Sequence, residues 1–392
     1  MPVYNVTRIG SAVGGYGDEV SLAVIRDGSS VATSSRNQNG YIEFTLWTLL
    51  SGGGIQIYSQ LSADPQAAAR VAGIGVGRFV TAGQSTHGGH IKSIFWIAGA
   101  NTGEGSAAQG HNAAIAAFPN LFAIISPPAN PPPPGTSVVY PEGYLAATAH
   151  VTEDHHVRVT SWFAGEKIAS GISTLASAKG GEAIFTSIVA KQTFLTATNL
   201  TSADVVTAVT TVDNLHLGAW RLHVDGSQPL SVEHLHGVAA NEPAKEVALA
   251  AYPPDPATVL VAAIVTPAGD LKLIAWQMQN DGGFTRWLDT TAGAASEVSC
   301  AWVTGSIVVT ACKTGSGVLK LIYWQLPASP TDPQTITRLT DIEGGSLPSF
   351  GGVSVGHWRA ANASANDLGE TLVGVRTAAG DLKVIRFHLT SS

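Results

Sequence analysis

The 392-residue sequence has few charged residues, no long apolar run and only two cysteines. Charged residues make up 12% of the chain and the formal net charge is −7, so no basic surface and no nucleic-acid partner are expected. No apolar run reaches the roughly 18 residues that a membrane-spanning helix needs. We therefore expect neither nucleic-acid binding nor a membrane span.

Cys300 and Cys312 are too few for a disulfide framework, and their spacing matches no metal-ligand motif. They flank a turn at 304–306, and in a hairpin centred on Ser306 they would lie opposite each other. A cross-strand disulfide and a pair of buried thiols both fit this pattern. Hydrolase, zinc-protease and phosphate-loop motifs are absent, so we expect no metal and no other cofactor.

Targeting signals are sparse. The N-terminal residues lack the apolar core of a signal peptide. N-glycosylation sequons occur at Asn5, Asn199 and Asn362, although about two would arise by chance in a chain so rich in serine and threonine. The low charge and the many small residues favour a secreted protein of fungal character, and we expect a signal peptide to have been removed.

One strand pattern, in contrast, occurs seven times. The clearest copies are GDLKLIAWQM at 269–278, GVLKLIYWQL at 317–326 and GDLKVIRFHL at 380–389. The aromatic residues of all seven copies recur every 48 to 66 residues: Trp47, Trp96, Trp162, Trp220, Trp276, Trp324 and Phe387. Because they repeat in phase with the strand, we expect these aromatic anchors to pack between neighbouring sheets rather than to bind a ligand.

Three further strands accompany each anchor strand. A strand such as VVTAVT at 205–210 precedes it across a short turn, which predicts a β-hairpin. A strand of small residues lies further upstream, and a more polar strand follows. The chain stops after the last anchor strand, and residues 3–10 resemble the missing outer strand. The N-terminus should therefore complete the last sheet and leave no open edge.

Repeats of this length, built from several short strands, are typical of β-propellers. The chain resembles the seven-bladed β-propeller superfamily over its whole length, in architecture and without a family motif. We predict an all-β fold, with residues 1–392 forming a single seven-bladed β-propeller whose last blade is closed by the N-terminal strand. The proline-rich stretch at about 119–143 is expected to be a surface insertion, because the repeat resumes in phase after it.

Propeller ligands usually bind at the mouth of the central channel, where the innermost strands begin. Alignment of these strands places one column of residues there: Glu19, Arg70, Asn112, Glu182, Glu246, Glu297 and Gly352. Converging carboxylates repel one another, so they must bind a cation, pair with arginine or hold a proton with a raised pKa. Alternatively, each glutamate pairs with the arginine of its own blade, as the Arg8/Glu19 and Arg286/Glu297 spacings suggest.

The hairpin turns of the first four repeats are more polar than those of the last three. Together with the strand EHLHG, they carry the histidines that we select: His87, His90, His155, His156, His216 and His236. Histidine suits proton transfer near neutral pH. The residues that we predict to be catalytic are Glu246, Glu182, His155 and His236. Those that we predict to bind a ligand are Glu19, Arg70, Asn112, Glu297, His87, His90, His156, His216, Trp302 and Trp358.

Trp302 and Trp358 end innermost strands and are expected at the far end of the channel. Such a site suits a cofactor-independent enzyme that acts on a small molecule by dehydration, isomerisation, lyase action or guided cyclisation. In size and character the chain is similar to secreted fungal biosynthetic propellers such as hetero-Diels–Alderases, which implies pericyclic cyclisation. A secreted propeller lectin and a protein-interaction platform remain alternatives. The strands repeat whereas the loops diverge, which favours one asymmetric site over several equal lectin sites.

Overall fold

The structure is a computed structural model that describes most of the chain: residues 3–24, 30–75, 78–97, 100–109, 111–124, 142–165, 172–196, 199–224, 231–251, 259–279, 281–327, 335–347, 352–360 and 363–392. The proline-rich run at 126–135 lies outside these ranges, so its expected role as a surface insertion stays a prediction. In the described ranges the elements are β-strands and one 3-10 turn, η1 (Ser51–Gly53). None of their helical segments has the length and hydropathy to cross a membrane.

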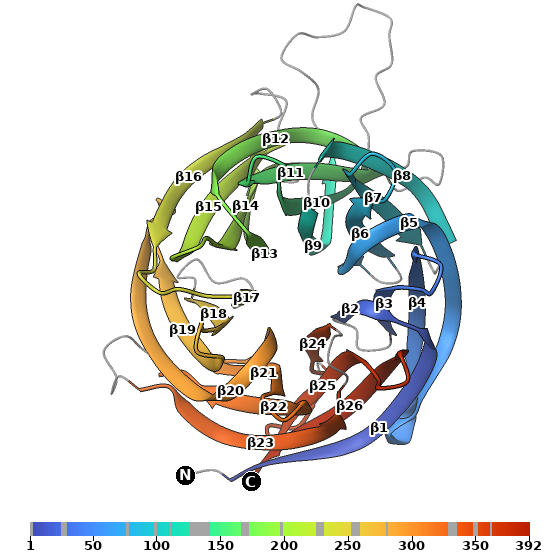
Figure 1. Ribbon diagram of the computed structural model, residues 1–392, viewed down its shortest axis with the longest axis vertical. Helices are drawn as coiled ribbons and strands as arrows, with labels where there is room; N and C mark the ends of the chain where they lie inside the picture. The colour runs from blue at the N-terminus through green and yellow to red at the C-terminus, as the bar shows by residue number, and fades with distance from the viewer. Residues whose placement is uncertain are drawn as a thin grey trace, which may run out of the picture.

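The strands form antiparallel four-stranded groups that stand in a ring around a central axis (Figure 1). Three sheets have four strands and two have seven. Each seven-stranded sheet is two groups joined by a long strand, β5 (Ile55–Gly75) or β20 (Phe284–Thr304), which is outermost in one group and innermost in the next. The described pairings thus comprise seven groups, which we number as blades 1 to 7. The prediction of an all-β propeller is confirmed.

The remaining strands follow in chain order. Blades 1 and 2 contain β2 (Asp18–Val24), β3 (Ser30–Arg36), β4 (Tyr41–Leu49), β6 (Arg78–Ser85), β7 (His90–Ile97) and β8 (Ala100–Gln109), besides β5. Blade 3 contains β9 (His111–Ile124), β10 (Glu142–Val151), β11 (His156–Gly165) and β12 (Ile172–Glu182). Blade 4 contains β13 (Phe185–Thr196), β14 (Asn199–Thr210), β15 (Leu215–His223) and β16 (Ser231–Ala239). Blades 5 and 6 contain β17 (Glu246–Ala251), β18 (Val259–Val265), β19 (Asp270–Met278), β21 (Ile307–Thr314), β22 (Val318–Gln325) and β23 (Thr337–Ser346), besides β20. Blade 7 contains β24 (Val353–Trp358), β25 (Asp367–Arg376), β26 (Asp381–Ser391) and β1 (Tyr4–Tyr16).

The two ends of the chain meet in blade 7. Strand β1 pairs antiparallel with β26, from Tyr4 opposite Ser391 to Tyr16 opposite Asp381. Val3 and Ser392 exchange backbone hydrogen bonds, and the two termini lie together on the outside of the ring (Figure 1). The N-terminal strand is therefore the outer strand of the last blade, as the sequence predicts.

The aromatic anchors are core residues. All seven are at most 3% exposed. Five of the six indoles donate from Nε1 to a threonine on the preceding strand, at 2.8–3.0 Å: Thr33, Thr81, Thr148, Thr207 and Thr310. Ala262 stands at this position before Trp276, whose buried Nε1 has no hydrogen-bond partner among the described residues. The repeated tryptophan is thus explained by packing and by one internal hydrogen bond.

Cys300 and Cys312 are free and buried. The register places Cys300 opposite Thr310 and Cys312 opposite Val298, so the two thiols are diagonal neighbours. The expectation that they lie opposite each other is wrong, because the two strands pair in a register centred on Gly305 rather than on Ser306. Burial raises the pKa of Cys300 to about 12, which makes this thiol unreactive.

Candidate functional site

The innermost strands enclose a cavity of about 220 Å³ around the propeller axis, which we call the channel cavity. Its wall includes residues from β2, β5, β9, β13, β17, β20 and β24. From the predicted column, Arg70, Glu246 and Gly352 line it directly. Gly352 is required there, because a Cβ at this position would lie 2.8 Å from the backbone oxygen of Val20.

Charged groups interact across this cavity. Burial lowers the pKa of Arg70 from its usual value, and the negative charges of Glu19 and Glu246 oppose that shift. Glu19 has a φ of 55°, a left-handed conformation that residues other than glycine rarely adopt. Its Oε2 is buried without a hydrogen-bond partner in the described ranges. Backbone strain together with buried charge is common at functional sites.

Glu246 has the most strongly perturbed carboxyl group of the channel. Burial, aided by the charge of Glu297, raises its pKa to about 7. The backbone N–H of Val298, which donates to this carboxylate, and the charge of Arg70 act in the opposite direction. A carboxyl group that titrates near pH 7 can both accept and donate a proton under physiological conditions.

Glu297 is held by a lysine rather than by an arginine of its own blade. Burial raises its pKa, while Lys313 on the neighbouring strand lies 3.4 Å from Oε1 and lowers it. Arg286 instead contacts Glu242 at 3.3 Å, and it also contacts Asp289. The pairing of Arg286 with Glu297 that the sequence suggests is therefore wrong. The two side chains belong to opposite ends of the long strand β20, which runs from blade 5 into blade 6.

Serine hydroxyls, which the sequence did not single out, tie the innermost strands together. Each accepts a hydrogen bond of 2.9–3.1 Å from a backbone N–H of another blade's innermost strand. The four pairs are Ser21 with Val71, Ser187 with Leu249, Ser299 with Val355, and Ser354 with Leu22. These bonds cross between blades, so they fix the wall of the channel cavity.

Glu182 does not belong to the channel column, and this prediction is wrong. It ends β12, where it lies opposite His156 of the neighbouring strand. Phe185 begins the innermost strand of blade 4, opposite Thr210, just as Glu246 lies opposite Val265 in blade 5. Phe185 therefore holds the column position. The outer strand of blade 3 runs almost directly into blade 4, which shifts the apparent alignment by three residues. The side chain of Asn112 lies outside the described part.

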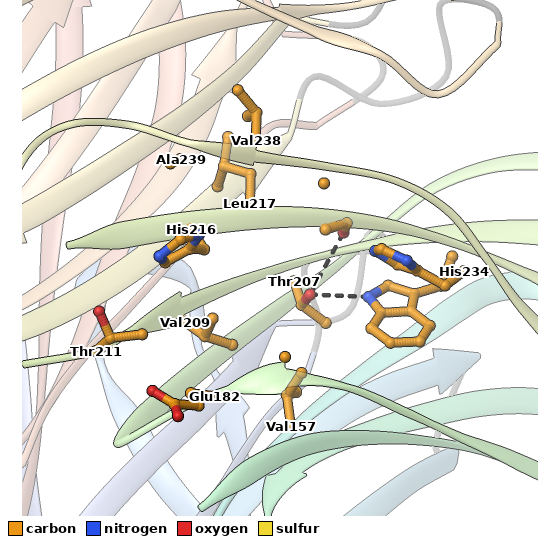
Figure 2. A pocket seen from close by; sticks show the side chains of 14 residues that line it. Val157, Glu182, Thr207, Val209, Thr211, His216, Leu217, His234, Val238 and Ala239 are labelled. Carbon is orange, nitrogen blue, oxygen red and sulfur yellow. Dashed lines mark hydrogen bonds between the residues drawn. The ribbon is translucent and has the colours of Figure 1, made fainter.

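A larger cavity, of about 440 Å³, lies between blades 3 and 4, and we call it the inter-blade cavity (Figure 2). Its wall comes from β11, β12, β14, β15 and β16 and from the loops beside them. Glu182 and His216 lie at one end, and His234 at the other, where its ring packs 4.5 Å from the indole of Trp220. Two residues that were selected from the sequence for the channel, Glu182 and His216, thus line this cavity instead.

The other selected histidines line neither cavity. His87 and His155 lie in exposed hairpin turns, and His90 begins β7. His156 is held by its own turn, because its Nδ1 lies 2.6 Å from the backbone oxygen of Asp154. Hydrogen bonds from Lys179 and Thr152 hold the pKa of Asp154 at about 2, so the Asp154 carboxylate in this turn is negatively charged at neutral pH.

His236 lies beside the next blade, since a Cβ at Gly282 would be 3.4 Å from its ring. Trp302 donates from Nε1 to the backbone oxygen of Gly305 at 2.8 Å, and it packs against the core between blades 5 and 6. Trp358 packs against the core between blades 7 and 1. Neither tryptophan lines the channel cavity. Within the described ranges, no three His, Cys, Asp or Glu side chains are grouped so as to hold a metal ion.

Comparisons with known proteins return structures only. AofleA from Arthrobotrys oligospora has 9% identity and a TM-score of 0.46, over 88% of this chain and 94% of that chain. The SapL1 lectin, in complex with alpha methyl fucoside, has 12% identity and a TM-score of 0.46, over 85% and 97%. A mutant of the α-L-arabinofuranosidase arb93a from Fusarium graminearum, bound to an iminosugar inhibitor, has 12% identity and a TM-score of 0.45, over 96% and 93%. At these values none of them indicates what this chain binds. No family model and no curated protein matches the sequence.

Proposed function

We propose that the protein is a cofactor-independent enzyme that transfers protons to and from a small molecule in the channel cavity. The observation that carries this proposal is Glu246, a carboxyl group whose pKa is raised to about 7 beside the guanidinium of Arg70. A general acid or base is most effective when its pKa lies near the working pH. A carboxyl group with a purely structural role would not need a pKa near the working pH.

The roles follow from the charges. Glu246 is the acid–base group, and Arg70 stabilises a negatively polarised oxygen of the substrate. Glu297 is a positioning residue, because its charge helps to raise the pKa of Glu246. Glu19 favours the charged form of Arg70. His155 and His236, which we selected from the sequence, have no role in this proposal, since neither lines the channel cavity.

The size of the channel cavity narrows the reaction. Small-molecule sites usually enclose about 300–1,000 Å³, whereas this cavity has about 220 Å³. A small carbonyl compound or hydroxy acid fits, and isomerisation, dehydration or lyase action needs only one proton-transfer group and one oxygen-binding group. Hetero-Diels–Alder cyclisation needs room for both reacting partners, so it is the less favoured reaction.

Solvent exchange tests the proposal without knowledge of the natural substrate. Small ketones, hydroxy ketones and hydroxy acids are incubated with the protein in D₂O, and proton NMR follows the loss of signal at the carbon beside the carbonyl group. We expect exchange with at least one compound, with a rate that changes around pH 7. Glu246→Gln should abolish the exchange. The matched control is Glu343→Gln, which neutralises an exposed carboxylate on β23. Equal exchange rates in Glu246→Gln and wild type would contradict the proposal.

We also propose that the protein is secreted. Asn5, in the sequon at residues 5–7, is exposed on β1 and therefore accessible to glycosylation. Expression with a eukaryotic signal peptide should give a product that loses mass on treatment with a peptide N-glycosidase, and Asn5→Gln should reduce that loss. A secreted product that carries no glycan on Asn5 would count against the proposal.

A further inference from the structure

The inter-blade cavity is a second site, separate in its residues from the proposed proton-transfer centre. Its volume of about 440 Å³ falls within the usual range for small-molecule sites. None of the residues that line it lines the channel cavity. It lies between blades 3 and 4, so its origin should be visible in how these two blades differ from the repeat.

The difference lies in the anchor strand of blade 4. Two positions before the anchor aromatic, four other blades carry isoleucine: Ile94, Ile274, Ile322 and Ile385. Each of these side chains is at most 3% exposed. Blade 4 has Gly218 there, and a Cβ added to it would lie 3.1 Å from Nε1 of Trp220 and 3.6 Å from Nε2 of His234. Gly218 lines the cavity, so an isoleucine at this position would fill part of it.

Two successive glycines on the facing strand have different surroundings. A Cβ at Gly180 of β12 would lie 2.7 Å from the indole of Trp220 and 2.8 Å from Val157. Gly181, which lines the cavity, has no atom within 4 Å of such a Cβ. Gly180 thus lets Trp220 and Val157 pack closely, whereas Gly181 leaves open space at the cavity, opposite Gly218.

Polar groups that could hold a ligand gather at one end of the cavity. Glu182 and His216 both lie at this end, on either side of Val209 (Figure 2), and no hydrogen bond to either side chain occurs within the described residues. The neighbouring hydroxyl of Thr211 is already bonded to the backbone of Asn214. A carboxylate accepts hydrogen bonds and a neutral imidazole both donates and accepts, so this end matches a ligand that carries several hydroxyl groups.

The rest of the cavity is apolar. Val157, Val209 and Leu217 line the middle, and His234 with Trp220 closes the other end (Figure 2). Burial lowers the pKa of His234, which keeps its ring neutral at pH 7. The C–H faces of a saturated ring pack well against such a wall, while its hydroxyl groups reach the polar end.

Charge distinguishes among ligand classes. Among the described residues of the cavity wall, Glu182 is the only charged one and there is no lysine or arginine, so an anionic ligand would be repelled. An organic cation would need an open aromatic face. Trp220 offers none, because its indole is 1% exposed and is packed against His234. A neutral, hydroxylated ring remains as the class that fits all the walls.

We infer that the inter-blade cavity binds a neutral, hydroxyl-bearing ring of monosaccharide size, with Glu182 and His216 bonded to its hydroxyl groups. Restoring the repeat should close the site. In Gly218→Ile the new side chain takes the place that isoleucine has in blades 2 and 6, where the threonine–tryptophan hydrogen bond is kept.

The probe is a panel of methyl glycosides of common hexoses, deoxyhexoses and N-acetylhexosamines, measured by saturation-transfer NMR and then by calorimetry. We expect at least one glycoside to bind wild type. Its affinity should fall at least tenfold in Gly218→Ile and severalfold in Glu182→Gln. Gly181→Val fills the same cavity from the other strand and serves if Gly218→Ile does not fold. Gly293→Val is the matched control, because Gly293 is also exposed with open space at its Cβ, but lies on β20.

Three results would overturn the inference. Either no glycoside of the panel binds, or binding persists in both filled variants, or the organic cation phenethylamine binds in place of the glycosides. Glu246→Gln should leave glycoside binding unchanged. Failure of the channel proposal and failure of this inference are therefore separate results.

Discussion

At the scale of single residues, Glu246 makes the stability of the protein depend on pH. A carboxyl group whose pKa is raised on folding stabilises the folded state below its unfolded pKa, and this contribution is lost as the pH rises through the folded pKa. For Glu246 the two values are 4.5 and about 7. The free energy of unfolding should therefore fall by up to about 3 kcal/mol between pH 4.5 and pH 8 because of this residue alone.

Urea unfolding of wild type and Glu246→Gln at these two pH values measures the effect. The variant carries no titrating group at this position, so its stability relative to wild type should increase as the pH rises. Glu343→Gln again provides the comparison, because it should follow wild type at both pH values. Parallel pH dependence in wild type and Glu246→Gln would show that the carboxyl group titrates normally.

The second prediction at this scale concerns Trp276, whose buried Nε1 has no partner among the described residues. Ala262→Thr should give it the hydrogen bond that the other five indoles have, and should raise the free energy of unfolding by about 1 kcal/mol. The opposite change in blade 6, Thr310→Ala, removes the partner of Trp324 and should cost about 1–3 kcal/mol. If Ala262→Thr destabilises the protein, blade 5 does not share the packing of its neighbours.

At the scale of elements, the serine bonds between innermost strands make a local prediction. Ser299→Ala removes the acceptor for the backbone N–H of Val355, the link between blades 6 and 7. We expect a loss of about 1 kcal/mol and faster hydrogen exchange at the Val355 amide. The amide of Leu249, whose partner Ser187 is unchanged, serves as the internal reference. Equal acceleration at both amides would point to global destabilisation rather than to a lost local bond.

The strands were also the most predictable part of the molecule. The anchor aromatics repeat in the sequence because every blade presents the same face to its neighbour, so their burial and the closure by β1 could be read directly from the spacing. The pairing registers of the strands were harder to predict from the sequence. The register centred on Gly305 displaced the cysteine pair, and the direct passage from β12 into β13 put Glu182 in the wrong column.

Sites were harder to read than strands, for a related reason. The charges of Arg70 and Glu297 act on Glu246, as expected for residues at one position of the aligned innermost strands, while their roles at a site stay predictions. The inter-blade cavity could not be predicted from reactive side chains, because part of its space comes from glycine at a position that is isoleucine in four other blades. The signal was nevertheless present: LHLGAW at 215–220 departs from LKLIAW at 271–276 at His216 and at Gly218, and both residues line the cavity.

At the scale of the whole molecule, closure depends on joining the two ends of the chain. The β1–β26 pairing is one such connection. Arg386 adds another: it forms an ion pair with Glu370, and its guanidinium donates a hydrogen bond of 2.8 Å to the backbone oxygen of Leu50 in blade 1. Asp18 at the start of blade 1 likewise contacts Arg376 of blade 7, at 3.2 Å. Side chains and a shared sheet therefore both connect the last blade to the first.

Deletion of residues 1–16 should open this ring. It removes the outer strand of blade 7 and leaves the edge of β26 unpaired, which promotes association through that edge. Light scattering after size exclusion should show higher oligomers or aggregate, and urea unfolding should lose its single cooperative transition. A monomeric, cooperatively unfolding deletion variant would show that β1 is dispensable for closure.

The proposed function rests on one property, the proton affinity of Glu246, and carboxyl-carbon NMR measures it directly. In protein labelled at glutamate carboxyl carbons, with Glu246→Gln used for assignment, the resonance should titrate with a midpoint near pH 7. In Glu297→Gln the midpoint should fall, because a charge that opposes ionisation is gone. A midpoint near 4.5 in wild type would contradict the account, since Glu246 would then be an ordinary ionised carboxylate at neutral pH.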